Sequence, residues 1–334
     1  MQERIVKIIL PEEFKDPALE LLETDKSVFY WLEESNSTNV VISMLVDSSQ
    51  TENLMDNFER RFGHTENFKL IVLPVEASLP RKKEEEKSEP EPEVKTKQKK
   101  STRISREELY SDIVDSTKLN GVFITMTILS TVVVAIGLLK DNVAVIIGAM
   151  VIAPFLGPNV ALALSSVLAE KKLGADAIKT LALGGLFVIL LSMSIGLIFP
   201  VDADLTEISS RTHLGYGDMA LALASGAAAV LAFTTGASAA LIGVMVAVAL
   251  LPPLTVSGLL LGAGDYKLAA GAILLFITNI ICVNLAGIVT FLLQGVSPRT
   301  WYASDKAKQA IRKSLLIWII TLLLLAVILY FWKT

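Results

Sequence analysis

The side chains in this chain that could bind something polar lie within apolar sequence. Asn159, Thr255 and Ser257 follow closely after prolines, and the next apolar stretch adds Asn279 and Asn284. Amides and hydroxyls donate and accept hydrogen bonds, but they do not ionise near neutral pH. The chemistry expected of them is therefore the binding of a small neutral solute, a small ion or water.

Prolines interrupt two of the apolar stretches that carry these side chains. Pro154, Gly157 and Pro158 interrupt the first stretch, and Pro252 and Pro253 interrupt the second. A proline in a helix has no N–H to donate, so the carbonyl four residues earlier loses its partner. Lipid offers no replacement, so such a break should face protein or water. Two interpretations stay open: a substrate pathway that meets the two breaks near the middle of a bilayer, and simple kinks tied by hydrogen bonds between helices.

The sequence offers little for catalysis or metal binding. It contains two histidines and one cysteine, and we find no phosphate-binding, zinc-protease or nucleophile-elbow motif. We expect no enzyme, no cofactor and no metal site. Asp202, Asp204 and His213 could bind a cation in an acidic loop, but a solvated loop is the favoured interpretation.

Long charge-free stretches place the chain among membrane proteins. Of its 334 residues 52% are hydrophobic, and the mean hydropathy is +0.56. A membrane-spanning helix needs about 20 apolar residues. The stretches are 121–139, 142–169, 180–201, 219–264, 268–298 and 314–332, and 219–264 is long enough for two helices. We therefore predict seven transmembrane helices within residues 120–334, the last over 314–332.

An internal repeat relates the two proline-containing stretches. Residues 129–158 align with residues 224–253 at a constant offset of 95, without a gap, and Gly148 and Pro158 meet Gly243 and Pro253. Each copy, about 120–200 and about 217–295, would hold three helices. Because three is odd, the second copy would enter from the opposite face. The prediction is a 3+3 inverted repeat plus one helix, a plan common among transporters.

Residues 1–78 read as a small ferredoxin-like α+β domain. Apolar β-branched runs predict strands over 4–10, 28–33, 39–46 and 68–75, with helices from Pro11 to about 24 and over 49–62. The resulting order is β-α-β-β-α-β. With fifteen acidic and seven basic residues, this domain is a poor candidate for nucleic-acid binding. We expect it to serve assembly or regulation, or else to bind a small-molecule ligand, near which His64 and Trp31 could lie; a surface histidine and a packed tryptophan are the favoured interpretation of these two.

A charged linker is predicted over residues 79–104 because it has too few apolar residues to fold. An amphipathic helix over 105–119, with Leu109 and Ile113 on its apolar side, should lie at the membrane surface. Lys and Arg mark cytoplasmic segments. Their distribution predicts a cytoplasmic N-terminus, an outer loop over 201–218 and a C-terminus outside.

Small residues recur every four positions in the fourth predicted span. They are Ala220, Ala224, Ala228 and Ala232. Such a stripe allows helix backbones to approach closely. It indicates packing within one subunit or across a homo-oligomer, for which a dimer or a trimer is expected.

Three segments carry a resemblance to a known family. Residues 129–158 and 242–261 resemble the hydrophobic family catalogued as domain of unknown function 389, and residues 71–80 resemble the end of the soluble domain in one branch of it. The resemblance implies a multi-pass protein of a prokaryotic inner (plasma) membrane, without naming a substrate or functional residues. The three-plus-three-plus-one plan is also similar to that of trimeric intracellular cation channels, as an analogy of arrangement.

These observations favour a transporter or channel for a small neutral solute or small ion, assembled or regulated by the ferredoxin-like domain. The alternative is a membrane-anchored sensor or scaffold, whose soluble domain binds a ligand or partner while nothing crosses the bilayer. A water-accessible cavity between the prolines would favour the first, and a tightly packed bundle the second.

Overall fold

The computed structural model describes residues 3–23, 28–33, 38–75, 106–235, 239–296, 312 and 316–321. The predicted linker over 79–104 lies outside the described residues, as does most of the predicted last helix over 314–332. The chain divides into two compact units, Met1–Glu108 and Leu109–Thr334, which are described separately.

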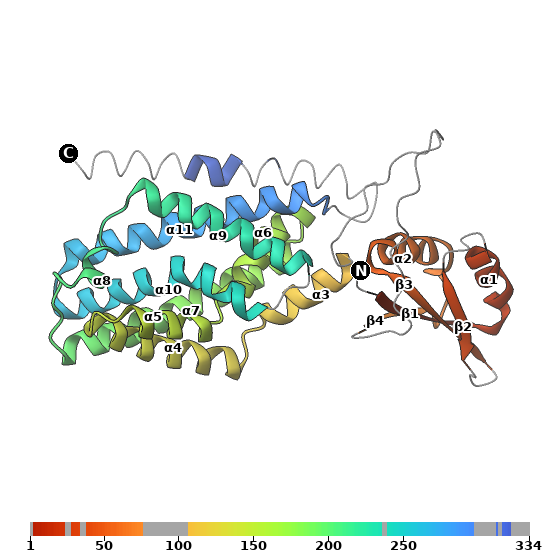
Figure 1. Ribbon diagram of the computed structural model, residues 1–334, viewed down its shortest axis with the longest axis horizontal. Coiled ribbons are helices and arrows are strands. Elements are labelled where there is room, and N and C mark those ends of the chain that lie inside the picture. The colour runs from red at the N-terminus through yellow and green to blue at the C-terminus, as the bar shows by residue number, and fades with distance from the viewer. Residues whose placement is uncertain are drawn as a thin grey trace, which may run out of the picture. The chain divides into compact units, whose positions relative to one another are not determined.

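The first unit contains an antiparallel sheet of four strands with the β-α-β-β-α-β order expected from the sequence (Figure 1). Its elements are β1 (Glu3–Pro11), the short 3-10 helix η1 (Glu12–Phe14), α1 (Lys15–Glu23), β2 (Phe29–Glu33), β3 (Asn39–Asp47), α2 (Ser48–Phe62) and β4 (Lys69–Pro74). The strand order is β2-β3-β1-β4, the ferredoxin-like arrangement. Pro11 ends β1 instead of opening a helix, because it still pairs with Asn39 of β3.

Alternation along β1 separates the two faces of this sheet. Val6, Ile8 and Leu10 are fully buried in a core that also contains Phe58 and Phe62 of α2. The residues between them point to the opposite face. There Lys7 lies 2.6 Å from a carboxylate oxygen of Glu33, which also accepts a 2.6 Å hydrogen bond from Ser43.

The second unit is a helical bundle. Its helices are α3 (Arg106–Thr117), α4 (Gly121–Leu139), α5 (Val143–Ile152), α6 (Leu156–Leu168), α7 (Lys171–Ile198), α8 (Thr206–Ser209), α9 (Tyr216–Thr235), α10 (Ala239–Ala263) and α11 (Tyr266–Leu293). The protein is membrane-embedded by the length and apolar character of these helices. Four of them, α4, α7, α9 and α11, could each cross a bilayer, and α5 with α6 would form a fifth span. Seven spans are not confirmed over the described residues.

The two proline-containing stretches adopt different structures. The predicted break at Pro154 is present: α5 ends at Ile152, α6 begins at Leu156, and their axes differ by 57°. The predicted break at Pro252 and Pro253 is wrong, since α10 runs through both prolines as one helix.

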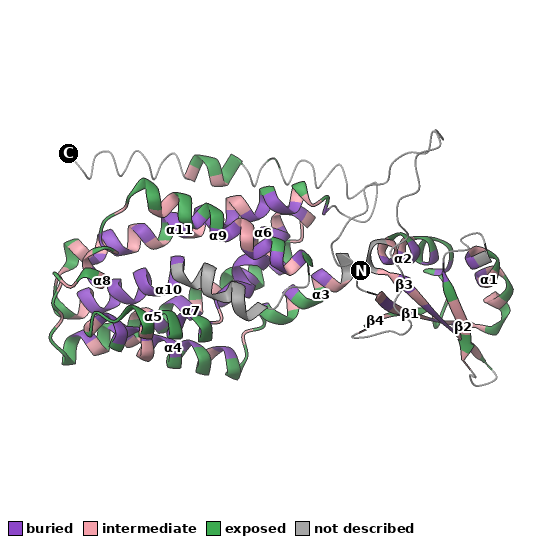
Figure 2. Ribbon diagram, in the orientation of Figure 1, coloured by how far each residue is buried: buried purple, intermediate pink, exposed green. Residues whose placement is uncertain are grey.

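Helix α10 occupies the middle of the bundle (Figure 1). It packs against α4, α5, α6, α7, α9 and α11. From Ala249 to Leu260 every residue is buried (Figure 2). The approach to α7 is close enough that Gly196 has no room for a side chain, because a Cβ there would overlap the carbonyl of Leu259.

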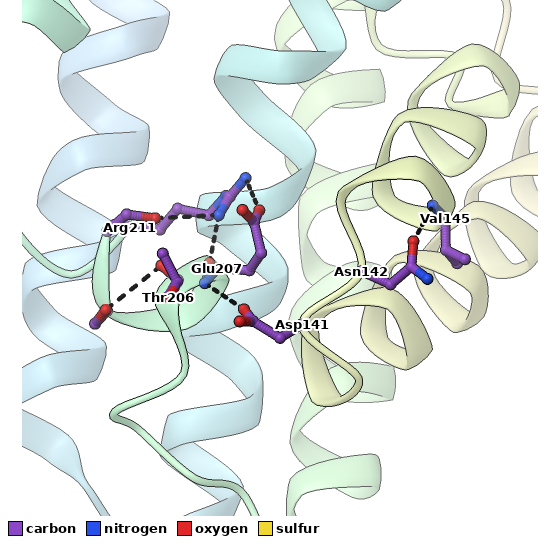
Figure 3. Close-up of polar contacts among 8 residues, drawn as sticks. Asp141, Asn142, Val145, Thr206, Glu207 and Arg211 are labelled. Carbon is purple, nitrogen blue, oxygen red and sulfur yellow. Dashed lines mark hydrogen bonds and ion pairs between the residues drawn. The ribbon is translucent and has the colours of Figure 1, made fainter.

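Polar contacts fix the loops at one end of the bundle (Figure 3). Asn142 caps α5 by accepting a 3.2 Å hydrogen bond from the Val145 amide. The neighbouring Asp141 carboxylate accepts a 2.8 Å hydrogen bond from the backbone of Glu207 in α8. Arg211 pairs with the Glu207 carboxylate at 2.7 Å. The loop over 201–218, predicted to be acidic and outside, is thereby anchored to the turn between α4 and α5.

Candidate functional site

The polar residues predicted to form a pathway all lie in the interior of the bundle. Asn159, Thr255, Ser257 and Asn284 are completely buried, and Asn279 is 4% exposed. They come from three helices that pack on one another, namely α6, α10 and α11. The prolines Pro158, Pro252 and Pro253 are buried as well.

Asn159 of α6 and Asn284 of α11 form an amide pair between helices. The Asn159 side-chain amide donates to the carbonyl of Phe155 at 2.8 Å. The Asn284 amide donates to the carbonyl of Ile280 at 2.9 Å and, at 3.4 Å, to the side-chain oxygen of Asn159. The side-chain oxygen of Asn284 is buried and has no hydrogen-bond partner among the described residues.

Asn279 meets the backbone that the prolines leave incomplete. Its side-chain amide donates a 2.7 Å hydrogen bond to the carbonyl of Ala249 in α10. In a regular helix that carbonyl would accept from the N–H of residue 253, which is a proline and has none. The Asn279 amide therefore replaces a missing backbone donor. Its own side-chain oxygen is buried without a partner in the part of the chain that the structure describes.

The two hydroxyls contribute less than the sequence suggested. Thr255 donates to the carbonyl of Leu251 at 2.9 Å, and Ser257 donates to that of Leu254 at 2.7 Å. Each hydroxyl proton is thus used within α10, as is common for Ser and Thr in helices. Only their acceptor lone pairs stay available.

The first turn of α6 packs against α3, which the sequence did not predict. Pro158 lies in that turn, where a missing N–H costs little. Gly157 lies so close to α3 that a Cβ would come within 2.5 Å of the Ser116 carbonyl oxygen. The hydroxyl of Thr180 in α7 donates to the Thr117 carbonyl at 3.0 Å.

Tyr110 and Glu170 add a second contact of α3 that sequence reasoning missed. The phenol of Tyr110 donates to the Glu170 carboxylate at 2.7 Å. Burial, followed by this hydrogen bond and the nearby negative charge, raises the pKa of Tyr110 to about 12. A tyrosine on the helix that the sequence predicts to be amphipathic was the only available signal.

The alanine stripe of α9 is not the face that packs on α11. Ala220 and Ala224 are exposed, Ala228 is half-buried, and only Ala232 is buried. The buried side of α9 contains Ala222, Ser225, Gly226 and Ala229 instead.

The polar groups of the acidic loop make local contacts. Asp202 accepts a 3.0 Å hydrogen bond from the Asp204 amide, and His213 lies 2.9 Å from the Thr212 hydroxyl. Among the described residues no three His, Cys, Asp or Glu side chains gather closely enough to hold a metal ion. In the ferredoxin-like domain His64 is exposed, and Trp31 packs 5.9 Å from Phe29 between ring centres.

Comparison with known proteins decides the family. The family described as a domain of unknown function (DUF389) matches residues 150–285. An uncharacterised protein of Methanocaldococcus jannaschii is 36% identical over 319 residues, which cover 96% of each chain. The chain belongs to the DUF389 family. No solved structure matches it.

The matched part of this DUF389 protein contains the whole polar site. Residues 150–285 run from the end of α5, through the break and α10, to Asn279 and Asn284 of α11. The soluble domain lies outside the matched residues, although the archaeal relative aligns along nearly the whole chain.

Proposed function

We propose that this protein is a membrane transporter or channel for a small neutral solute or a small ion, bound by the amides of Asn159, Asn279 and Asn284. The observation that carries the proposal is the pair of buried amide oxygens, on Asn279 and Asn284, that lack partners among the described residues. A buried polar atom without a partner costs about 1–3 kcal/mol. Asparagines placed in this way are best explained by something polar that occupies the site during function.

The chemistry of the site suits a neutral ligand that donates hydrogen bonds, or a small cation. Its free groups are oxygen acceptors, and the side chains that form it carry no charge. A buried carboxylate is the usual sign of proton coupling within a membrane. Among the described residues, no Asp or Glu is buried. The proposed transport is therefore handled by dipoles, without protons exchanged at the site.

The arrangement of helices supports a two-fold relation between the two halves of the proposed repeat. If α4, α5/α6 and α7 correspond to α9, α10 and α11, then the third helix of each half packs on the middle helix of the other. These pairs are α7 with α10, and α11 with α6. The first helices follow the same rule, since α4 packs on α10 and α9 packs on α6. A two-fold relation between the halves produces such reciprocal contacts.

The alternative function, a membrane-anchored sensor or scaffold, is supported by the tight packing of the same residues. Asn159 and Asn284 bond to each other and to their own helices with no exposed surface. Such amides also tie helices together without any ligand. In that case the ferredoxin-like domain would carry the activity, whereas in the leading proposal it assembles or regulates the bundle.

A flux assay separates the two functions. The full chain, Asn159→Ala, Asn284→Ala and Ser194→Ala would be reconstituted into liposomes, and light scattering would follow entry of urea, glycerol, Na⁺ and K⁺. Ser194 is a matched control, since its hydroxyl bonds within α7 and it is exposed. We expect flux of at least one probe for the unchanged chain and for Ser194→Ala, and its loss in both asparagine variants.

The scaffold alternative predicts a different result for the same proteins. No probe would cross faster than through empty liposomes, and the asparagine changes would lower only the thermal stability. An unchanged flux per folded protein in both asparagine variants would show that transport, if present, does not use this site.

A further inference from the structure

The middle of α10 lacks two backbone hydrogen bonds, and a side chain from a neighbouring helix replaces one of them. Pro252 and Pro253 remove two consecutive backbone donors from the middle of the helix. A proline inside a helix costs about 3 kcal/mol or more. The single described group that compensates from another helix is the Asn279 amide, which takes the place of the missing N–H of residue 253.

The other half of the molecule contains the broken form of the same element. At the offset of 95 residues, Pro158 corresponds to Pro253, and both lie inside a helix. Pro154 corresponds to Ala249, and there the first copy bends by 57°. The same repeat thus adopts a broken conformation in one copy and a continuous one in the other.

We propose that the proline pair of α10 is a hinge and that Asn279 is the positioning residue that keeps it straight. While the Asn279 amide bonds to the Ala249 carbonyl, α10 is continuous. When the bond is released, α10 opens at Pro252–Pro253 in the way that α5 and α6 are already separated. The unpartnered oxygen of Asn279 makes this residue sensitive to a ligand, because a donor bound there would turn or hold the amide.

If α10 opened at the proline pair, its contacts with helices of both halves of the bundle would change. Helix α10 packs on α4, α5, α6 and α7 of the first half and on α9 and α11 of the second. Asn279 lies on α11, which also bears Asn284 and its contact to Asn159. One helix therefore touches both the continuous element and the broken one.

The test uses hydrogen exchange followed by mass spectrometry on the full chain in nanodiscs, which needs no ligand. Asn279→Leu removes the donor, and Pro253→Ala restores the backbone N–H that the Ala249 carbonyl lacks. We expect Asn279→Leu to speed exchange in peptides covering residues 250–257 about tenfold, and the double variant to return it to the original rate. Asn284→Leu, on the same helix, should leave these peptides unchanged.

Opening in the unaltered protein is tested by Pro253→Ala alone. We expect this change to slow exchange in the same peptides several-fold below the original rate, because it restores the N–H that bonds to the Ala249 carbonyl in a regular helix. If Pro253→Ala exchanged at the same rate as the original chain, α10 would not open in the unaltered protein, and the hinge would be overturned. Normal exchange in Asn279→Leu, or a double variant that is not restored, would also overturn it.

The liposome assay then separates this inference from the proposed function. If the unchanged chain carries a probe, Pro253→Ala should reduce the flux at least tenfold although the protein is more stable. Full flux in Pro253→Ala would overturn the hinge and leave transport standing. If the unchanged chain carries no probe, the proposed function fails, and the exchange data still decide whether α10 opens.

Discussion

At the scale of the residue, side-chain amides and carboxylates in this protein replace hydrogen bonds that the backbone cannot make. Asn120, Asn142 and Asp265 each accept from a backbone N–H in the first turn of a helix. Such caps contribute about 0.5–2 kcal/mol each. Asn279 does the converse deep in the bundle, because it donates to a carbonyl that proline has left free.

The end of α6 offers a test of backbone strain at one residue. Ala169 has φ 59° and ψ 31°, a left-handed conformation that glycine adopts more easily. We expect Ala169→Gly to raise the free energy of unfolding by about 0.5–1 kcal/mol. The control is Ala175→Gly at an exposed position of α7, which should lower it by a similar amount. Thermal unfolding in one detergent measures both, and a loss of stability at position 169 would contradict the argument.

The contact between Tyr110 and Glu170 predicts a change at alkaline pH. The pKa of Tyr110 is raised from 10.0 to about 12 in the folded protein. The stabilisation by its neutral phenol is therefore fully present below about pH 10 and lost as the pH rises toward about 12. We expect the melting temperature of Tyr110→Phe to fall less steeply than that of the original chain over this range. Identical slopes would show that the contact does not contribute.

The sequence shows which polar side chains lie within the apolar stretches, but not which of them touch. A proline in an apolar stretch frees a carbonyl, and a buried polar side chain must then lie nearby. That the partner is Asn279, and that it reaches Ala249, depends on how α11 is rotated against α10. Residue spacing and composition do not determine that rotation angle. From the sequence alone, Thr255 and Ser257 were therefore equally good candidates for the partner of the free carbonyl.

At the scale of the element, position within the helix decides what a proline does. Pro158 lies in the first turn of α6, where its missing N–H has no helical partner to lose. Pro154 lies between the end of α5 at Ile152 and the start of α6, where the two axes differ by 57°. Pro252 and Pro253 lie in the middle of α10, where neighbours on all sides and one amide hold the helix together. The prolines are visible in the sequence. Whether each one breaks its helix or lies within a continuous helix depends on the tertiary contacts around it.

The junction of α6 with α3 depends on a missing side chain. A methyl group added at Gly157 would lie 2.5 Å from the Ser116 carbonyl oxygen, whereas at Gly148 of α5 it would meet nothing within 4 Å. We expect Gly157→Ala to lower the free energy of unfolding by about 1–3 kcal/mol through overpacking. Gly148→Ala should be neutral or stabilising by up to about 1 kcal/mol. Equal stability of the two variants in a thermal melt would show that α3 does not pack there.

At the scale of the whole molecule, the sequence predicted a soluble α+β domain followed by apolar helices, and both are present. The alternation of β1 and the long apolar runs are strong local signals, and they needed no tertiary information. Span number is a weaker prediction, because length and apolar character leave four or five candidate spans among the described residues. The 3+3 arrangement depends on which end of each helix faces which side of the membrane.

Thiol labelling in intact cells tests that orientation. In a Cys282→Ser background, a cysteine at Asp204 should react with a membrane-impermeant reagent from outside. A cysteine at Lys171 should react only after the cells are opened. Both positions are exposed; Lys171 is the first residue of the long helix α7, and Asp204 follows its end. Labelling of both from the same side would exclude α7 as a span and remove the inverted repeat.

The exposed part of the alanine stripe predicts an assembly of identical chains. Ala220 and Ala224 do not pack within the described part of the subunit, so close contact with a second copy is open to them. We expect a dimer or trimer by mass measurement in nanodiscs. Ala224→Trp should shift it toward smaller species, and Leu186→Trp, also on an exposed apolar surface, should not. A monomer for the unchanged chain at all concentrations would contradict this prediction.

Asn279 and Asn284 lie five positions apart on α11, and that spacing has a mechanical consequence. Five residues turn a helix by about 140° beyond a full revolution, so the two amides project from clearly different sides. One engages α10 and the other engages α6. A rotation of α11 about its own axis would therefore change the contact with α10 and the contact with α6 at the same time. Inserting one alanine between positions 279 and 284 would change their phase by about 100° and uncouple them, which no substitution at either asparagine could do.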